Sequence, residues 1–232
     1  MNRLVINKMP MLSYSTEEAV NRLRVNLNFL GKDIRKIMII SSTENEGKSF
    51  VAFHLWRQIA QSGTPAILLD ADLRKSVMRE KYQMEAADGK ELFGTSHVLA
   101  KDMALKDAIW HTDMEKGDIL PNIENVINPA MLFEGQCFHR LLDEMAEQYR
   151  YVLVDVPPLD LVSDGERIGF MCDGAILVTA SGRVSRRMVR NSMRQLERAG
   201  CPLLGIVLNR VEDKKKQNYY KNYGYHEKQP RT

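Results

Sequence analysis

The segment SSTENEGKSF, residues 41–50, carries the residue types that bind phosphate groups. Gly47, Lys48 and Ser49 follow an apolar run and open a predicted helix, which is the setting of a P-loop. Free backbone N–H groups at a helix start attract anions. We expect Lys48 to reach the β- and γ-phosphates of a nucleotide and Ser49 to place its hydroxyl on Mg²⁺. The segment therefore predicts nucleotide binding.

The loop departs from the usual GxxxxGK[ST] pattern. Ser42 stands where the first glycine would be. Asn45 occupies a position that suits glycine, and asparagine tolerates a left-handed backbone better than most other residues. Glu44 and Glu46 would repel a triphosphate if they faced it, so we expect both side chains to point outward.

Aspartates follow two other apolar runs. In AILLDADLRKS, Asp70 and Asp72 stand at the end of a predicted strand. In YVLVDVPP, Asp155 stands at the end of another. Ligands in open α/β sheets collect at the carboxyl ends of the strands, so these carboxylates are expected beside the P-loop, where they form a plausible Mg²⁺ cage. The alternative is that Asp70 and Asp72 only cap the helix that follows them.

The C-terminal segment contains an unusual tyrosine cluster. The stretch QNYYKNYGYH, residues 217–226, holds four of the eight tyrosines. No aliphatic residue follows Val211, so this segment cannot bury enough apolar surface to offset the entropy of ordering it. We interpret residues 212–232 as a flexible or loosely docked tail. A solvated tail with no role is the alternative.

The elements that must position these residues can be read from the apolar pattern. Buried strands are predicted at 36–41, 66–70, 151–155, 174–179 and 203–209, and helices at 16–30, 47–62, 129–148 and 184–199. Gly31, Gly63 and Gly200 are expected to end three of these helices. Strand–helix alternation predicts a single doubly wound, mostly parallel α/β sheet flanked by helices, as in P-loop NTPases. We divide the chain into an N-terminal extension (1–15), one domain (16–211) and the tail.

Composition excludes several function classes. The 232-residue chain has no apolar run approaching the roughly 20 residues that span a bilayer, and its start lacks a signal-peptide core, so a cytoplasmic location is expected. The three cysteines, Cys137, Cys172 and Cys201, are expected to be reduced thiols, and the histidines form no metal pattern. A net charge of +3 is too small to indicate nucleic-acid binding.

Several segments, in order, resemble those of the bacterial tyrosine kinases (BY-kinases) of the CpsD/CapB type. SSTENEGKS is similar to their Walker A motif, LLDADLRKS to Walker A′, and YVLVDVPPLDLVSD to Walker B. EEAVNRLRVNLNF resembles their first-helix oligomerisation motif, LPNIENVINPAML their Asn-Pro loop, and LLGIVLNRV their last core strand. With the tyrosine cluster, the resemblance covers nearly everything from Thr16 onward.

The resemblance implies an ATP- and Mg²⁺-dependent tyrosine kinase that phosphorylates its own tail and regulates capsular or extracellular polysaccharide synthesis and export. The implied catalytic residues are Lys48, Asp70, Asp72 and Asp155, and the implied metal ligands are Ser49, Asp70 and Asp155. The implied autophosphorylation sites are Tyr219, Tyr220, Tyr223 and Tyr225. The implied nucleotide-binding residues are Ser42, Thr43, Glu44, Asn45, Glu46, Gly47, Lys48, Ser49, Phe50 and, near the adenine, Asn209.

The resemblance also implies partners. In this family the first helix joins subunits into a ring through an ExxRxxR pattern, and here Glu18 and Arg24 match its outer positions. Asn21 replaces the middle arginine and Arg22 lies one place later, about 100° around the helix, so the alternative is a plain surface helix with solvated charges. A transmembrane activator of the polysaccharide co-polymerase type would recruit the chain to the inner face of the plasma membrane and complete the nucleotide site. A cognate tyrosine phosphatase would reverse the modification.

Two rival interpretations remain. A MinD/ParA-like ATPase switch would dimerise with ATP and hydrolyse it without forming phosphotyrosine. A non-catalytic nucleotide-binding scaffold would bind ATP weakly and not turn it over. Departures from the family pattern, Glu44-Asn45 in place of Pro-Gly and bulky Phe50 beside Ser49, could alter nucleotide affinity.

Overall fold

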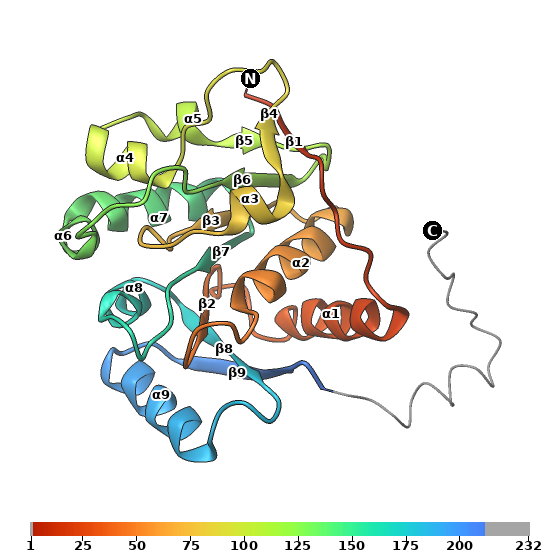
Figure 1. Cartoon of the computed structure of the whole chain (residues 1–232), viewed down its shortest axis with the longest axis vertical. Coiled ribbons are helices and arrows are strands. Elements are labelled where there is room, and N and C mark those ends of the chain that lie inside the picture. The colour runs from red at the N-terminus through yellow and green to blue at the C-terminus, as the bar shows by residue number, and fades with distance from the viewer. Residues whose placement is uncertain (1, 212–232) are drawn as a thin grey trace.

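A seven-stranded sheet runs through the centre of the molecule (Figure 1). The structure is a computed structural model, and it describes residues 2–211. Neighbouring strands of the sheet are parallel, except that the first edge strand is antiparallel to the second. From one edge to the other the strands are β5 (Trp110–His111), β6 (Gly117–Leu120), β3 (Ala66–Asp70), β7 (Tyr151–Asp155), β2 (Lys36–Ser41), β8 (Gly174–Ala180) and β9 (Leu203–Asn209).

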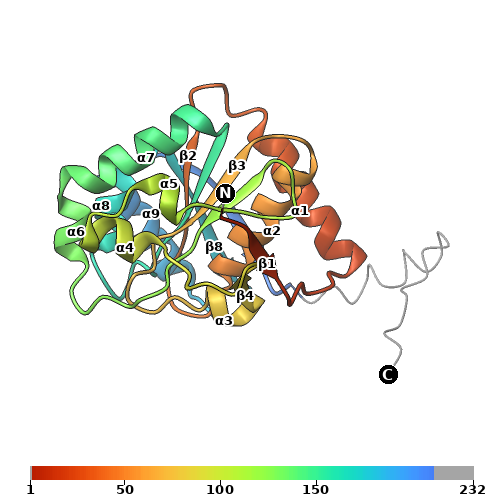
Figure 2. The same cartoon turned by 90° about the horizontal axis from the view of Figure 1, so that it is seen from above.

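Helices cover both faces of the sheet, which gives three layers (Figure 2). The doubly wound α/β fold is therefore confirmed. One face carries α1 (Tyr14–Leu27), α2 (Lys48–Gln61) and α3 (Met78–Tyr82). The other face carries α4 (Thr95–Lys101), α5 (Leu105–Ala108), α6 (Ala130–Glu134), α7 (Gln136–Gln148), α8 (Asp164–Phe170) and α9 (Arg186–Arg198).

The apolar runs of the central strands fill two separate cores. Ile37 and Ile39 of β2 pack under α1 and α2, whereas Met38 and Ile40 of the same strand pack under the helices of the opposite face. Successive side chains of a strand point to opposite faces, so a strand buried on both sides must be apolar at every position. This requirement explains why these strands do not alternate between apolar and polar residues.

The predicted core strands agree closely with the structure, and β8 ends at Ala180, one residue beyond its predicted end. Gly63 and Gly200 directly follow the C-cap residues of α2 and α9 with positive φ, as expected of helix-ending glycines. Gly31 also has a positive φ but does not end α1, which stops at Leu27, before the predicted end at residue 30. The single helix predicted over 129–148 is wrong. It is divided at Gly135, which has an extended backbone (φ −77°, ψ 157°), into α6 and α7.

The N-terminal segment packs against the rest of the chain. A short strand, β1 (Leu4–Ile6), pairs antiparallel with β4 (Met84–Ala86), and the Leu4 side chain is buried in the core beneath α2. Three residues are too few to show a strand period in the sequence. Residues of the predicted N-terminal extension thus contribute to the core.

Two further predictions concern membrane-spanning helices and the tyrosine-rich tail. Within residues 2–211, no helix combines the length and the apolarity needed to cross a bilayer. The predicted tail, with Tyr219, Tyr220, Tyr223 and Tyr225, lies outside the described residues.

Candidate functional site

The carboxyl ends of β2, β3 and β7 bring the predicted chemical residues together. Asp70 and Asp155 are direct partners in the register of β3 and β7, so both stand at the same level of neighbouring strands. The P-loop follows β2, the next strand along, and leads into α2. Parallel strands make this convergence possible because their carboxyl ends share one edge of the sheet.

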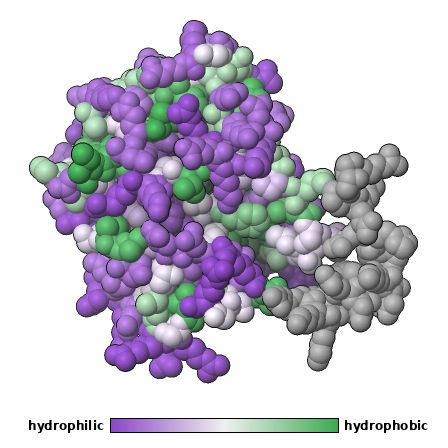
Figure 3. Space-filling view, in the orientation of Figure 1, coloured by the Kyte–Doolittle hydropathy of each residue, from purple (hydrophilic) through white to green (hydrophobic). Residues whose placement is uncertain are grey.

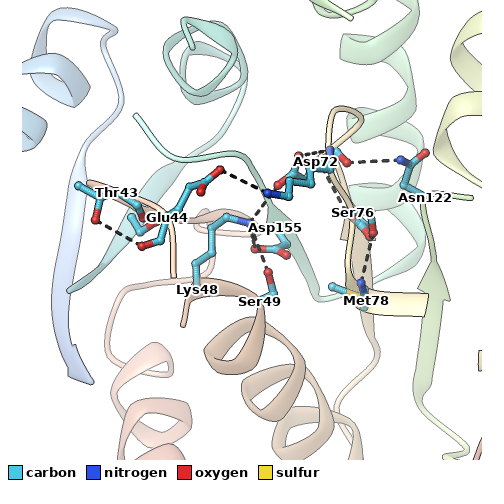
Figure 4. A network of polar contacts seen from close by, with 12 residues as sticks. Thr43, Glu44, Lys48, Ser49, Asp72, Ser76, Met78, Asn122 and Asp155 are labelled. Carbon is cyan, nitrogen blue, oxygen red and sulfur yellow. Dashed lines mark hydrogen bonds and ion pairs between the residues drawn. The ribbon is translucent and has the colours of Figure 1, made fainter. Parts of the chain in front are cut away.

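Lys48 lies at the centre of this cluster (Figure 4). Its Nζ is 3.3 Å from Asp72 Oδ2, 3.4 Å from Asp155 Oδ1 and 3.2 Å from Ser49 Oγ. Burial lowers the pKa of Lys48, but the charges of Asp155, Asp72 and Asp70 outweigh it and hold the pKa above its ordinary value. The lysine is therefore a fixed cation that faces the predicted phosphate position.

Asp70 and Asp155 are almost fully buried. Burial raises the pKa of both carboxyls, and the charge of Asp155 raises that of Asp70 further, whereas Lys48 opposes the rise at Asp155. Asp70 accepts hydrogen bonds from the backbone N–H of Asp72 and from the Ser76 hydroxyl. Two buried carboxylates with one nearby lysine carry a surplus of negative charge, which favours a divalent cation.

Asp72 fixes the turn after β3 and also faces Lys48, whereas α3 begins at Met78 with no side-chain cap, so the helix-capping alternative is wrong. Its Oδ1 accepts a hydrogen bond from the backbone N–H of Lys75 over 3.1 Å, which caps the turn after β3. Its Oδ2 faces Lys48. The turn interaction therefore does not remove Asp72 from the site, because it fixes the carboxylate with its second oxygen directed at Lys48.

The donor set fits Mg²⁺ bound together with a nucleotide. Among the described residues, no three acidic, histidine or cysteine side chains are grouped so that they could hold a metal ion by themselves. Mg²⁺ in phosphate-transfer sites takes only one or two protein ligands and completes its octahedron with phosphate oxygens and water. The Ser49 hydroxyl and the Asp155 carboxylate, both beside Lys48, supply oxygen atoms of the kind that such a Mg²⁺ ion binds.

Glu46 does not point outward as predicted. Only 1% of the residue is exposed, and its carboxylate accepts hydrogen bonds from the Thr43 N–H (2.6 Å), the Thr43 hydroxyl (3.2 Å) and the Ala180 N–H (3.0 Å). Backbone donors of its own loop and of β8 hold the charge in place of solvent. Glu44 is exposed, as predicted, and lies 4.0 Å from Lys75.

The rest of the loop adopts the backbone that the sequence requires. Asn45 has the left-handed backbone predicted for it (φ 61°). Gly47 also has a positive φ of 95°, and a Cβ on it would lie 2.1 Å from the Asn209 side-chain amide. Ser42 is buried and its hydroxyl accepts a hydrogen bond from Ser192 Oγ of α9.

Comparison with known proteins agrees with this geometry. Residues 37–230 match the CobQ/CobB/MinD/ParA nucleotide binding domain family. The chain is 34% identical to the tyrosine-protein kinase CpsD of Streptococcus agalactiae over 210 residues, which are 90% of each chain. This chain belongs to the CpsD family of bacterial tyrosine kinases. It is also 29% identical to the tyrosine-protein kinase YwqD of Bacillus subtilis, over 97% of this chain and 92% of that one.

Solved structures of this kinase family share the fold. The kinase domain of the Escherichia coli tyrosine kinase ETK has a TM-score of 0.76 and 30% identity, over 86% of this chain and 78% of that one. The chimerical protein CapA2B2 also has a TM-score of 0.76, with 27% identity, over 84% of this chain and 85% of that one. The MinD protein of Pyrococcus horikoshii, with 23% identity and a TM-score of 0.64, shares the fold alone.

Phe50, the departure from the CpsD pattern beside Ser49, packs against His54 and Lys81. Its ring lies 4.3 Å from the ring of His54, and Lys81 Nζ lies 5.4 Å from it. His54 is buried, and neither of its ring nitrogens has a hydrogen-bond partner among the described residues. Phe50 therefore belongs to an aromatic cluster under α3.

Residues that sequence reasoning missed support the Walker A′ segment of this kinase family member. Ser76 donates a hydrogen bond to Asp70, and the Asn122 side chain donates to the Asp72 carbonyl over 3.3 Å. Arg74 forms two hydrogen bonds, of 2.7 and 3.1 Å, with the fully buried Asp164. Ser76 and Arg74 lie within the quoted motif, but no sequence signal identifies their partners.

The predicted oligomerisation residues of the CpsD-like first helix lie on α1. Glu18 and Arg24 are half-buried, and Arg22 is exposed. Arg24 donates twice to Asn21 Oδ1, over 3.2 and 2.9 Å. Asn21 stands where the motif has its middle arginine. It accepts hydrogen bonds from the Arg24 guanidinium, which the motif would offer to a neighbouring subunit.

Proposed function

We propose that this chain is a protein-tyrosine kinase that transfers the γ-phosphoryl group of ATP to tyrosines of its own C-terminal segment, from one copy to another. The observation that carries the proposal is Lys48 Nζ held between Asp72 and Asp155 at the strand ends. The membership in the CpsD family and the similarity to YwqD support it. The proposed acceptors are Tyr219, Tyr220, Tyr223 and Tyr225.

Each site residue has a role in this reaction. Bound Mg-ATP supplies the phosphoryl group and a metal charge that neutralises it. Lys48 and the backbone of residues 42–50 hold the phosphates, and Ser49, Asp155 and Asp70 hold the metal and its waters. A tyrosine hydroxyl has a pKa of about 10 and needs a proton acceptor late in the transfer. Asp72 is the proposed acceptor, because its Oδ1 is fixed by the Lys75 N–H and its Oδ2 faces the site.

Asn209 is proposed to lie beside the adenine. Its side chain is already held on both sides, because Nδ2 donates to the Glu46 carbonyl and Oδ1 accepts from the Arg210 N–H. These bonds fix the amide beside the loop, so its contribution is to place the base relative to Lys48.

The proposal extends to partners and location. The family resemblance supports a cytoplasmic kinase that works with a transmembrane activator and a tyrosine phosphatase to regulate capsular or extracellular polysaccharide synthesis. A ring of copies would present each C-terminal segment to a neighbour, through Glu18, Arg22 and Arg24 of α1.

Phosphosite mapping by mass spectrometry tests the reaction. The full chain is incubated with Mg-ATP, alone and with a cytoplasmic segment of the activator fused to it. Lys48→Met removes the phosphate-holding charge, and Lys90→Met, at an exposed lysine far along the chain, is the matched control. Phosphate on Tyr219–Tyr225 in the wild type and in Lys90→Met, but not in Lys48→Met, is expected. ATP hydrolysis without phosphotyrosine in both formats would favour the ATPase switch instead.

A further inference from the structure

Helix α9 carries a concentration of arginine that the proposed reaction does not use. Residues 183–198 contain six arginines and no lysine. We call this set the arginine stripe, and its members are Arg183, Arg186, Arg187, Arg190, Arg194 and Arg198. Glu197 is the only carboxylate in the same span.

The stripe faces away from the protein. Ser192 and Leu196 of α9 are buried against the sheet side, and Val189 packs partly into the same core. At about 100° per residue, most arginines of α9 fall on the opposite side of the helix and Arg186 lies at its flank. All six arginines are exposed, and the surface over α9, at the lower edge of Figure 3, is strongly hydrophilic.

Among the described residues, the arginines of the stripe form no ion pairs. None of its guanidinium groups has an ion pair or a side-chain hydrogen bond with another residue in the range 2–211. Six neighbouring cations repel one another, so an anion that spans several of them would be attracted. Arginine binds phosphate through two parallel N–H donors, whereas lysine offers a point charge, so an all-arginine surface favours phosphate groups.

The C-terminal segment leaves the described structure beside the loop that leads into α9. Val211 comes two residues after β9. The Asn209 carbonyl accepts a hydrogen bond from the Ser181 N–H, which places the end of β9 against the segment that leads into α9. Tyr219 lies eight residues beyond Val211, a reach of up to about 28 Å, and α9 from Arg186 to Arg198 is about 18 Å long. The tyrosines can therefore reach the stripe of their own chain.

Phosphorylation would reverse the charge of that segment. Residues 212–232 contain six basic and three acidic side chains, so the unmodified segment is positive and is repelled by the stripe. Each phosphotyrosine adds about −1.5 to −2 charges at pH 7, and four of them make the segment negative overall. The attraction is thus switched on by the modification itself.

We propose that the arginine stripe is a phosphotyrosine-binding surface that takes the phosphorylated C-terminal segment of this chain. The proposal rests on the proposed function for the source of the phosphates. Because the segment is tethered, its local concentration at the stripe is in the millimolar range for a short flexible connection. Docking would withdraw a finished substrate from neighbouring active sites.

Two other interpretations of α9, a phosphate site in its groove and a bilayer-binding helix, fit the structure less well. A groove of about 690 Å³ runs along α9 beside Arg194 and Arg198, but Asp160 and Glu197 also line it, so its charges balance and it attracts phosphate less than the outer face of the stripe. Insertion into a bilayer needs large apolar side chains opposite the basic ones, and here that face of α9 is buried in the protein.

Fluorescence anisotropy with synthetic peptides tests the surface directly. Labelled peptides of residues 212–232, with phosphate on all four tyrosines or on none, are titrated with the full chain. We expect the phosphopeptide to bind at least roughly tenfold more tightly than the unmodified peptide. The variant R187Q/R190Q/R194Q should lose roughly tenfold or more of that affinity, and R187K/R190K/R194K roughly threefold, because lysine keeps the charge but not the paired donors.

The matched control is K8Q/K32Q/K106Q, which removes the same charge from exposed positions elsewhere. It should bind the phosphopeptide as the wild type does. Equal losses in both triple variants would show attraction to net charge alone and overturn the proposal, as would unchanged binding by R187Q/R190Q/R194Q. Cosedimentation with phosphatidylglycerol vesicles adds a further outcome. If that variant loses vesicle binding but keeps phosphopeptide binding, the stripe is a membrane surface instead.

The test is independent of catalysis because the peptide phosphates are synthetic. A chain that proves inactive in phosphosite mapping can still bind the phosphopeptide, and an active kinase can fail to bind it. The two proposals therefore fail separately.

Discussion

The side-chain amide of Asn209 donates a hydrogen bond to the backbone carbonyl of Glu46, over 2.9 Å, and so joins the end of β9 to the start of α2. The two residues are far apart in the chain but meet at the turn that opens the phosphate loop. Gly47 lies directly beneath the amide, because it has no Cβ. The last strand of the sheet thus helps to fix the loop that faces the nucleotide.

Gly47→Ala should weaken nucleotide binding. The new Cβ would lie 2.1 Å from Asn209 Nδ2 and would sit on a backbone with φ of +95°, so the amide must move and the bond to Glu46 is lost. We expect the affinity for ADP, measured by calorimetry, to fall at least roughly tenfold. Gly63→Ala is the control, since it has φ of +81° but nothing within 4 Å. It should cost about 1 kcal/mol of stability and leave ADP affinity unchanged.

Glu46→Gln should destabilise the fold although it conserves shape. Glutamine has one acceptor oxygen, so it cannot serve both the Thr43 N–H and the Ala180 N–H, and one buried donor is left unpaired. The expected loss in free energy of unfolding, from urea titration, is about 2 kcal/mol. Glu44→Gln, at the exposed glutamate of the same loop, should change it by less than about 0.5 kcal/mol. Equal effects at the two positions would contradict this account.

His54 should make the fold sensitive to mild acid. Burial, together with the charges of Arg57 and Lys81, lowers the pKa of His54 to about 4. In the unfolded chain the imidazole titrates at about 6.5, so between these values only the unfolded state takes up the proton. The contribution to stability is complete above pH 6.5 and is lost as the pH falls toward 4.

Two variants separate the titration of His54 from its packing. His54→Leu and His54→Gln should both reduce the stability lost between pH 7 and pH 5, by about 1 to 2 kcal/mol. Only His54→Leu should also stabilise the fold at pH 7, because it removes the two unpaired ring nitrogens. A pH dependence that persists in both variants would show that another group causes it. The measurement is the free energy of unfolding at each pH.

Asn21→Arg should increase self-association. The change restores the middle position of the oligomerisation motif and releases Arg24 from its hydrogen bonds to Asn21. Sedimentation velocity in the presence of Mg-ATP should show a shift toward larger species. Asn26→Arg adds the same charge at another exposed position of α1 and should leave the distribution as in the wild type. Identical distributions for the wild type and both variants would show that Asn21 and this face of α1 are not part of an assembly interface.

The sequence was most informative where burial imposes a pattern. Strands β2, β3 and β7 were predicted with their observed bounds, because an element covered on both faces must be apolar throughout. The bounds of β9 were also predicted, although it is an edge strand on which Ile206 and Leu208 are exposed. The short elements were missed for the opposite reason. β1 and β4 have three residues each and β5 has two, and such lengths carry no periodicity.

The site was predictable in its members but not in all its contacts. Lys48, Asp70, Asp72 and Asp155 converge because parallel strands end at one edge, a rule that holds for open α/β sheets in general. The inward position of Glu46 was not predictable, because Ala180, whose N–H donates a hydrogen bond to the Glu46 carboxylate, lies 134 residues away in the chain. The charge of Glu46 alone predicted repulsion from a triphosphate, whereas the backbone N–H of Ala180 holds the side chain inward.

The attachment of the C-terminal segment has a mechanical consequence. Val211 is separated from Asn209 by a single residue, and Asn209 is bonded to the phosphate loop through the Glu46 carbonyl. The Ser181 N–H also holds the Asn209 carbonyl, so the point at which the chain leaves the sheet and the phosphate loop share one anchor. A shift of Asn209 would therefore displace the loop as well.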